Sequence, residues 1–165
     1  GVALTQISRD IGRNTNAQSK NAAGATTGFS SDFNLVDLIA NGTFDTGRSD
    51  YPIELTANFV KNTKAETSED FGYWLTAAYG SASKPGTFQL SYTYAHIERE
   101  AVLSVFTFSD TPGTNIQMHQ PVISYMIAPR VHLDFTGIFT KKLAVSASAS
   151  NKLLKRTQLD ARVSF

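Results

Sequence analysis

The sequence predicts an all-β protein: an antiparallel up-and-down transmembrane β-barrel with about eight strands in this chain. Three observations predict this fold. Apolar and polar residues alternate in segments of about ten residues, the length of a tilted membrane-spanning strand. Long and short links between the segments alternate along the chain. Aromatic residues gather near both ends of the apolar faces, and aliphatic residues lie between them.

The first two predicted strands are the least regular in pattern. Residues 2–11 are assigned as the first strand, and residues 32–44, which are rich in strand formers, as the second. In the second segment Phe33 and Leu35 break the parity that begins at Val36. A β-bulge would reconcile the two parities.

Five later segments alternate without interruption: 52–62, 71–80, 86–95, 131–140 and 157–165. Successive side chains of a strand point to opposite faces, so each segment has one apolar and one polar face. A further strand is predicted over residues 116–127. It contains Pro121, which cannot donate to a ladder and indicates a strand end or a bulge.

The links separate into two kinds. The short ones are DTGRSDY, SASKP and APR, and the longer ones are the tract 13–31, the charged KAETSED, and the stretches EREAVLSVFTFSDTPGTN and KLAVSASASNKLLK. Short turns at one end and longer loops at the other are typical of outer-membrane barrels. Within loop 98–114, residues 99–106 are expected to form a short helix. The loop would either fold into the lumen and narrow it or cap the rim.

Two aromatic girdles are predicted around an aliphatic band, as expected where rings lie at both lipid interfaces. The girdle residues are Phe59, Phe71, Tyr73, Tyr92, Tyr94 and Phe139 at the long-link end, with Tyr79 and Phe88 at the other. The polar face supplies the candidate lumen lining: Glu54, Asn58, Gln89, His132, Asp134, Asp160 and Arg162. A soluble barrel would instead turn its apolar face inward.

Composition argues against other classes of function. The net charge is +1, and the 15 basic residues form no run that would track a nucleic-acid backbone. The chain has no cysteine, so disulfides and thiolate metal sites are excluded. Its three histidines lie on separate segments without metal-ligand spacing, and no GxSxG motif occurs. We therefore expect no enzymatic activity, no cofactor, no metal and no nucleic-acid partner.

The stretch 70–110 carries a family resemblance. It contains an aromatic strand, a turn with Lys-Pro-Gly, a second strand with an aromatic-x-Tyr pattern, and an acidic segment. The residues of that last segment are Glu98, Ala101, Val102, Leu103, Phe106, Ser109 and Asp110. This pattern resembles the C-terminal part of a porin family of Gram-negative outer membranes.

The resemblance implies an outer-membrane porin that allows passive diffusion of small hydrophilic solutes. Its partners would be outer-membrane lipid and, during insertion, the barrel-assembly machinery, and homo-oligomerisation is left open. Family members have about twice as many strands, so the chain would be the C-terminal half of a barrel of roughly 16–18 strands with an aqueous channel. The alternative is a complete eight-stranded barrel whose closed lumen makes it an anchor, adhesin or structural protein. A soluble lipocalin-like binder is a third hypothesis.

Residues 1–165 are predicted to be a single barrel region that ends in an assembly-signal strand, 157–165. Its apolar positions are Leu159, Ala161, Val163 and Phe165. In outer-membrane proteins the last strand ends in an aromatic residue, with apolar residues at alternate positions before it. The strand 157–165 resembles this signal, which the barrel-assembly machinery recognises. Such an edge strand pairs with another sheet by β-augmentation.

Overall fold

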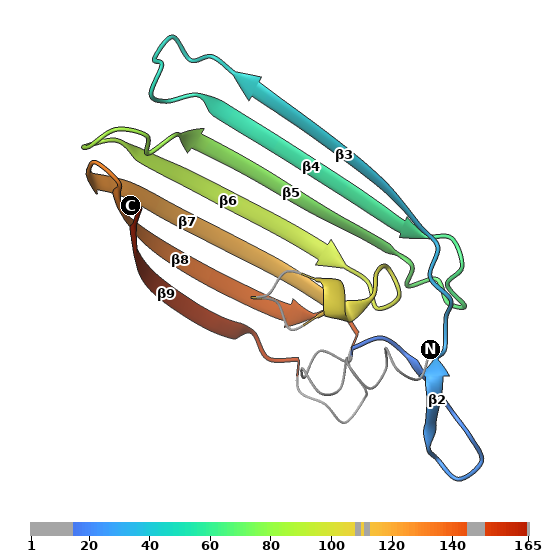
Figure 1. The fold of residues 1–165 in the computed structure, drawn as a ribbon. Helices are drawn as coiled ribbons and strands as arrows, with labels where there is room; N and C mark the ends of the chain where they lie inside the picture. The colour runs from blue at the N-terminus through green and yellow to red at the C-terminus, as the bar shows by residue number, and fades with distance from the viewer. Residues whose placement is uncertain (1–14, 108–109, 111–112, 145–150, 165) are drawn as a thin grey trace.

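The computed structural model describes residues 15–107, 110, 113–144 and 151–164. Its main element is a seven-stranded antiparallel sheet whose strand order follows the chain (Figure 1). The strands are β3 (Leu35–Phe44), β4 (Ile53–Asn62), β5 (Phe71–Gly80), β6 (Phe88–Ile97), β7 (Ile116–Ala128), β8 (Val131–Lys142) and β9 (Leu154–Val163). The all-β, antiparallel, up-and-down prediction is confirmed. The predicted first strand, 2–11, lies outside the described residues.

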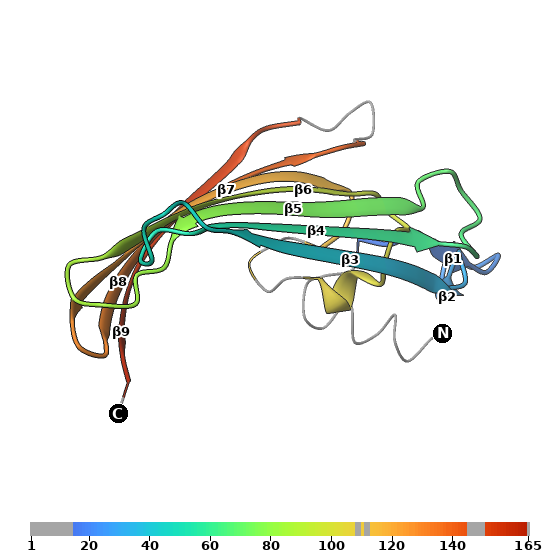
Figure 2. The same ribbon diagram turned by 90° about the horizontal axis from the view of Figure 1, so that it is seen from above.

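The sheet is open within the described part of the chain. β3 and β9 form its two edges, and no closed barrel is present there. Figure 2 shows one curved layer, with the 3₁₀ turn η1 (Ser104–Phe106) beneath it. The links at one end are 45–52, 81–87 and 129–130, and those at the other are 63–70, 98–115 and 143–153. The predicted difference in link length between the two ends therefore comes from the last two long links, 98–115 and 143–153.

Two predicted irregularities are wrong. The β3–β4 register runs unbroken from Leu35 opposite Asn62 to Phe44 opposite Ile53, so no bulge is needed. Pro121 lies inside β7, and the β7–β8 register is the same on both sides of it. A Cβ on Gly137 would lie 3.1 Å from the Phe139 ring and 3.4 Å from the Pro121 ring, so the Phe139 ring is the closer of the two neighbours.

The N-terminal tract contains a hairpin that the sequence pattern did not predict. β1 (Gln18–Lys20) pairs with β2 (Thr26–Phe29) in a separate two-stranded sheet. Asn21 closes the turn, because its Oδ1 accepts hydrogen bonds from the backbone N–H groups of Ala23 and Ala25. The strands are too short to show a clear alternation.

A small core lies between the sheet and the loop that follows β6. Its buried residues are Ala95, Ile97, Ala101, Ile116, Met118 and Ile138. Trp74 and Val102 pack against them. In this loop the helix predicted over 99–106 is reduced to the single turn η1.

Candidate functional site

One face of the sheet is apolar and exposed. Register places one row of apolar residues across all seven strands: Phe44, Ile53, Tyr79, Leu90, Ile123, Phe135 and Leu159. Leu90 is 43% exposed, Phe135 50% and Leu159 74%. Soluble monomers rarely expose a contiguous apolar patch of more than a few hundred Å². An exposed apolar face of this kind is typical of a surface that contacts protein, ligand or lipid.

The predicted girdle residues all lie on the apolar face, and most form two clusters. At the long-link end Phe59 contacts Phe71 and Tyr73, with ring centroids 6.5 and 6.3 Å apart. At the other end Tyr51, which the pattern missed because it precedes β4, stacks on Tyr79 at 5.6 Å. Tyr51 also contacts Phe88 at 5.1 Å.

Tyr92 departs from its predicted place near the long-link end. It lies in the middle of β6, opposite Ala77. Its hydroxyl lies 2.5 Å from Nδ1 of His119, toward the long-link end. The middle of the apolar face is thus not purely aliphatic.

The predicted lumen residues share the opposite, polar face. Gln89, Asp134 and Asp160 belong to one row that crosses β6 to β9. His132 lies opposite Arg162, and Glu54 and Asn58 lie on the same face of β4. Strand parity therefore placed all seven residues on one face, and their role as a lumen lining stays a prediction.

The polar face contains a bidentate ion pair. Arg162 donates from Nε to Asp134 Oδ2 at 2.5 Å and from Nη2 to Oδ1 at 3.0 Å. The partner of Arg162 lies on the neighbouring strand, because the β8–β9 register brings Asp134 within its reach.

The described residues of the loop between β6 and β7 (98–107, 110 and 113–115) include a part that packs onto the polar face rather than only capping the rim. Glu100, Ala101 and Ser104 are fully buried. The covered part of the sheet includes Trp74 and Met118. Constriction of a lumen by this loop stays a prediction, because the described sheet is open.

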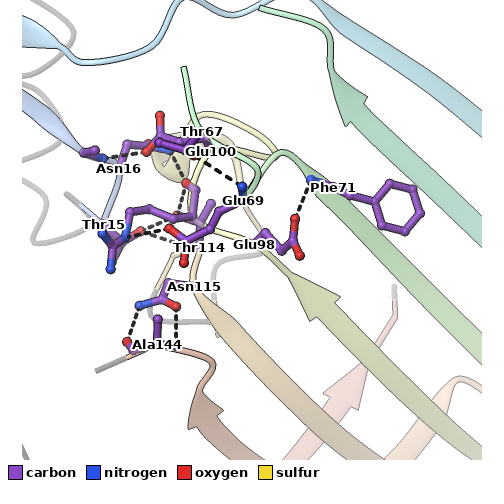
Figure 3. A network of polar contacts seen from close by, with 12 residues as sticks. Thr15, Asn16, Thr67, Glu69, Phe71, Glu98, Glu100, Thr114, Asn115 and Ala144 are labelled. Carbon is purple, nitrogen blue, oxygen red and sulfur yellow. Dashed lines mark hydrogen bonds and ion pairs between the residues drawn. The ribbon is translucent and has the colours of Figure 1, made fainter. Parts of the chain in front are cut away.

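A short strap, residues 15–17, fastens this loop (Figure 3). Asn16 Nδ2 donates to the carbonyl oxygens of Arg99 at 2.7 Å and Val102 at 2.9 Å. Asn16 Oδ1 accepts from the Ser104 N–H at 2.8 Å. Thr15 Oγ1 accepts from the Thr114 N–H at 2.7 Å. One short segment thus binds both the beginning and the end of the loop.

Glu100 joins the strap, the loop and the sheet. Its Oε1 accepts a 2.6 Å hydrogen bond from the Ala17 N–H, and its own N–H donates to the Glu69 carbonyl at 2.8 Å. Asn62 Nδ2 donates to the Glu100 carbonyl at 3.0 Å. Burial raises the pKa of the Glu100 carboxyl, and the hydrogen bond from Ala17 opposes that shift.

The loop ends are also anchored to the sheet. The Phe71 N–H donates to Glu98 Oε2 at 2.9 Å. Asn115 and Ala144 exchange two hydrogen bonds of 2.8 and 2.9 Å, which link the loop to the segment after β8 (Figure 3). Asn16 and Glu100 were not among the candidate residues predicted from the sequence. The available signal was a carboxyl residue beside the apolar run Ala101–Leu103 in a loop.

Fold and site together define an antiparallel meander sheet with one exposed apolar face and one polar face that a strapped loop partly covers. No family model, curated protein or solved structure matches the chain. Over the described ranges no helix is long and apolar enough to cross a membrane. No group of three or more potential metal-ligating side chains occurs among the described residues either.

Proposed function

We propose that this chain is part of an outer-membrane β-barrel of a Gram-negative bacterium that lets small hydrophilic solutes diffuse through a water-filled lumen. The apolar face contacts lipid, and the polar face lines the lumen. The observation that carries the proposal is the exposed apolar face across seven strands with aromatic clusters at both ends. Membrane barrels have an outward apolar band between two aromatic girdles.

Closure of the barrel needs strands beyond the described sheet. The outer sides of β3 and β9 have no strand partner there. Unpaired backbone groups cost several kcal/mol each in hydrocarbon, so both edges must be paired in a membrane. Residues 2–11 are one predicted source of a strand, and a barrel of roughly 16–18 strands would enclose an aqueous channel.

The loop 98–115 narrows the lumen in this proposal. The strap and the Glu98 and Asn115 anchors support a fixed position for the loop on the polar face. A fixed constriction lowers the size limit for solutes, because the loop occupies part of the cross-section that the barrel alone would leave open.

Reconstitution in planar bilayers tests the proposed function. The purified full-length protein should migrate differently on a gel with and without boiling, and it should give discrete conductance steps. A protein that stays soluble and monomeric without detergent would contradict the membrane assignment.

A closed small barrel that acts as an anchor or adhesin is the second candidate. It is favoured by the contents of the polar face, where the Asp134–Arg162 pair and the packed loop occupy space. This candidate predicts a heat-modifiable membrane protein that produces no conductance steps. The same bilayer experiment therefore separates the two functions.

A further inference from the structure

The charges on the polar face are not balanced once ion pairs are taken into account. Its charged strand residues are Asp37, Glu54, Asp134, Asp160, Lys142, Arg156 and Arg162. Arg162 is paired with Asp134, and Arg156 is paired with Asp110 of the loop. Both arginines are therefore largely neutralised by a partner.

The strand residues of this face that keep a free charge are mostly acidic. Within the described residues Asp37, Glu54 and Asp160 form no ion pair, and all three are exposed. Asp37 accepts one hydrogen bond, from Asn58 Nδ2 at 2.8 Å. Lys142 is the basic strand residue of this face without an ion pair in that part of the chain, and it is the last residue of β8, at the rim.

The three acids lie where the loop leaves the sheet uncovered. The loop covers polar-face positions on the middle strands, among them Ala95, Ile116 and Ile138. Asp37 lies on β3 and Asp160 on β9, the two edge strands, and Glu54 lies at the short-link end of β4, the end opposite to the one that contacts the loop. A solute that passes the loop must therefore travel along surfaces whose unpaired charges are negative.

We propose that the lumen prefers small hydrophilic cations over anions, and that Asp37, Glu54 and Asp160 set this preference. The inference rests on the proposed pore function and names its solute class. Inward carboxylates favour cations in pores because they raise the local cation concentration and repel anions. Lys142 opposes them only at the rim.

The test is the reversal potential of the full-length protein in a planar bilayer with a KCl gradient. The wild-type protein should give a potential of the sign that favours K⁺. The triple variant D37N/E54Q/D160N should shift that potential toward zero, and each single variant should shift it by part of that amount. The effect should be larger in dilute salt, because the screening length is about 30 Å at 0.01 M and about 10 Å at 0.1 M.

A matched control neutralises three exposed acids outside the sheet: D32N/D45N/E66Q. This control should keep most of the wild-type potential. All six acids are exposed, and heat-modifiability checks the folding of each variant. Glu54→Lys provides an independent charge reversal, which should shift the potential further toward zero than Glu54→Gln does.

The outcomes separate the two proposals. A wild-type pore with no cation preference, or a triple variant that folds and conducts with an unchanged potential, overturns the inference and leaves the pore function standing. A folded membrane-inserted protein without any conductance overturns the pore function and the inference with it.

Discussion

Replacing Asn16 with alanine should release the loop from the polar face. Asn16 is 5% exposed and makes three hydrogen bonds to the loop backbone. At a net value of about 1 kcal/mol each, their loss destabilises the docked loop by about 3 kcal/mol. Because each 1.4 kcal/mol is a factor of ten, the undocked population should rise about 100-fold.

Limited trypsin digestion measures this population through cleavage after Arg99, a basic residue inside the loop. When the loop opens and closes faster than it is cut, the cleavage rate follows the open population. Asn21→Ala is the matched control, because Asn21 makes its two side-chain hydrogen bonds within its own exposed turn. Its cleavage rate should stay close to that of wild type. Equal rates of cleavage after Arg99 in wild type and Asn16→Ala would refute the role of the strap in holding the loop.

Two further predictions concern Glu100 and the turn after β5. The pKa of the Glu100 carboxyl in the docked loop is raised above its ordinary value of 4.5. At a pH between the ordinary and the raised pKa, the docked state therefore binds more protons than the undocked state. Docking of the loop weakens as pH rises through the raised pKa. Glu100→Gln should remove that pH dependence from cleavage after Arg99; an unchanged dependence would assign it to another group. Gly80→Ala should prevent stable folding, because φ is +86° and the new Cβ would lie 2.2 Å from the Phe88 carbonyl oxygen. Gly86→Ala, at φ +87° with no atom within 4 Å, should cost only about 1 kcal/mol in a denaturant titration, and equal losses would contradict the steric account.

The strands β4, β5, β6, β8 and β9 could be predicted well because they alternate with period two and are separated by recognisable links. Predicted segments such as 52–62 and 71–80 match β4 and β5 closely. β3 was harder because apolar residues lie on both of its faces: Leu35 and Ile39 on one, Val36 and Leu38 on the other. An edge strand with two apolar faces gives no single parity, which led to the incorrect bulge.

The two faces of the sheet followed from parity alone, but the contacts between them and the loop did not. The partner of Arg162 depends on the stagger between β8 and β9, which alternation does not report. The strap depends on Asn16 meeting carbonyl groups 83 and 86 positions further along the chain. A single polar side chain in an irregular segment leaves no periodic signal, so this part of the site required the structure.

Fluorescence quenching at two neighbouring positions of β6 tests the central claim, that the apolar face contacts lipid. The chain has no cysteine, so Leu90→Cys and Ser91→Cys each place one label, on the apolar face and on the polar face respectively. In vesicles, the account predicts that a quencher on the acyl chains reaches the label at position 90, and that a water-soluble quencher reaches the label at position 91. If neither quencher reached the label at position 90 while the water-soluble quencher reached the label at position 91, the apolar face would be the interior of a soluble barrel, and this result would contradict the account.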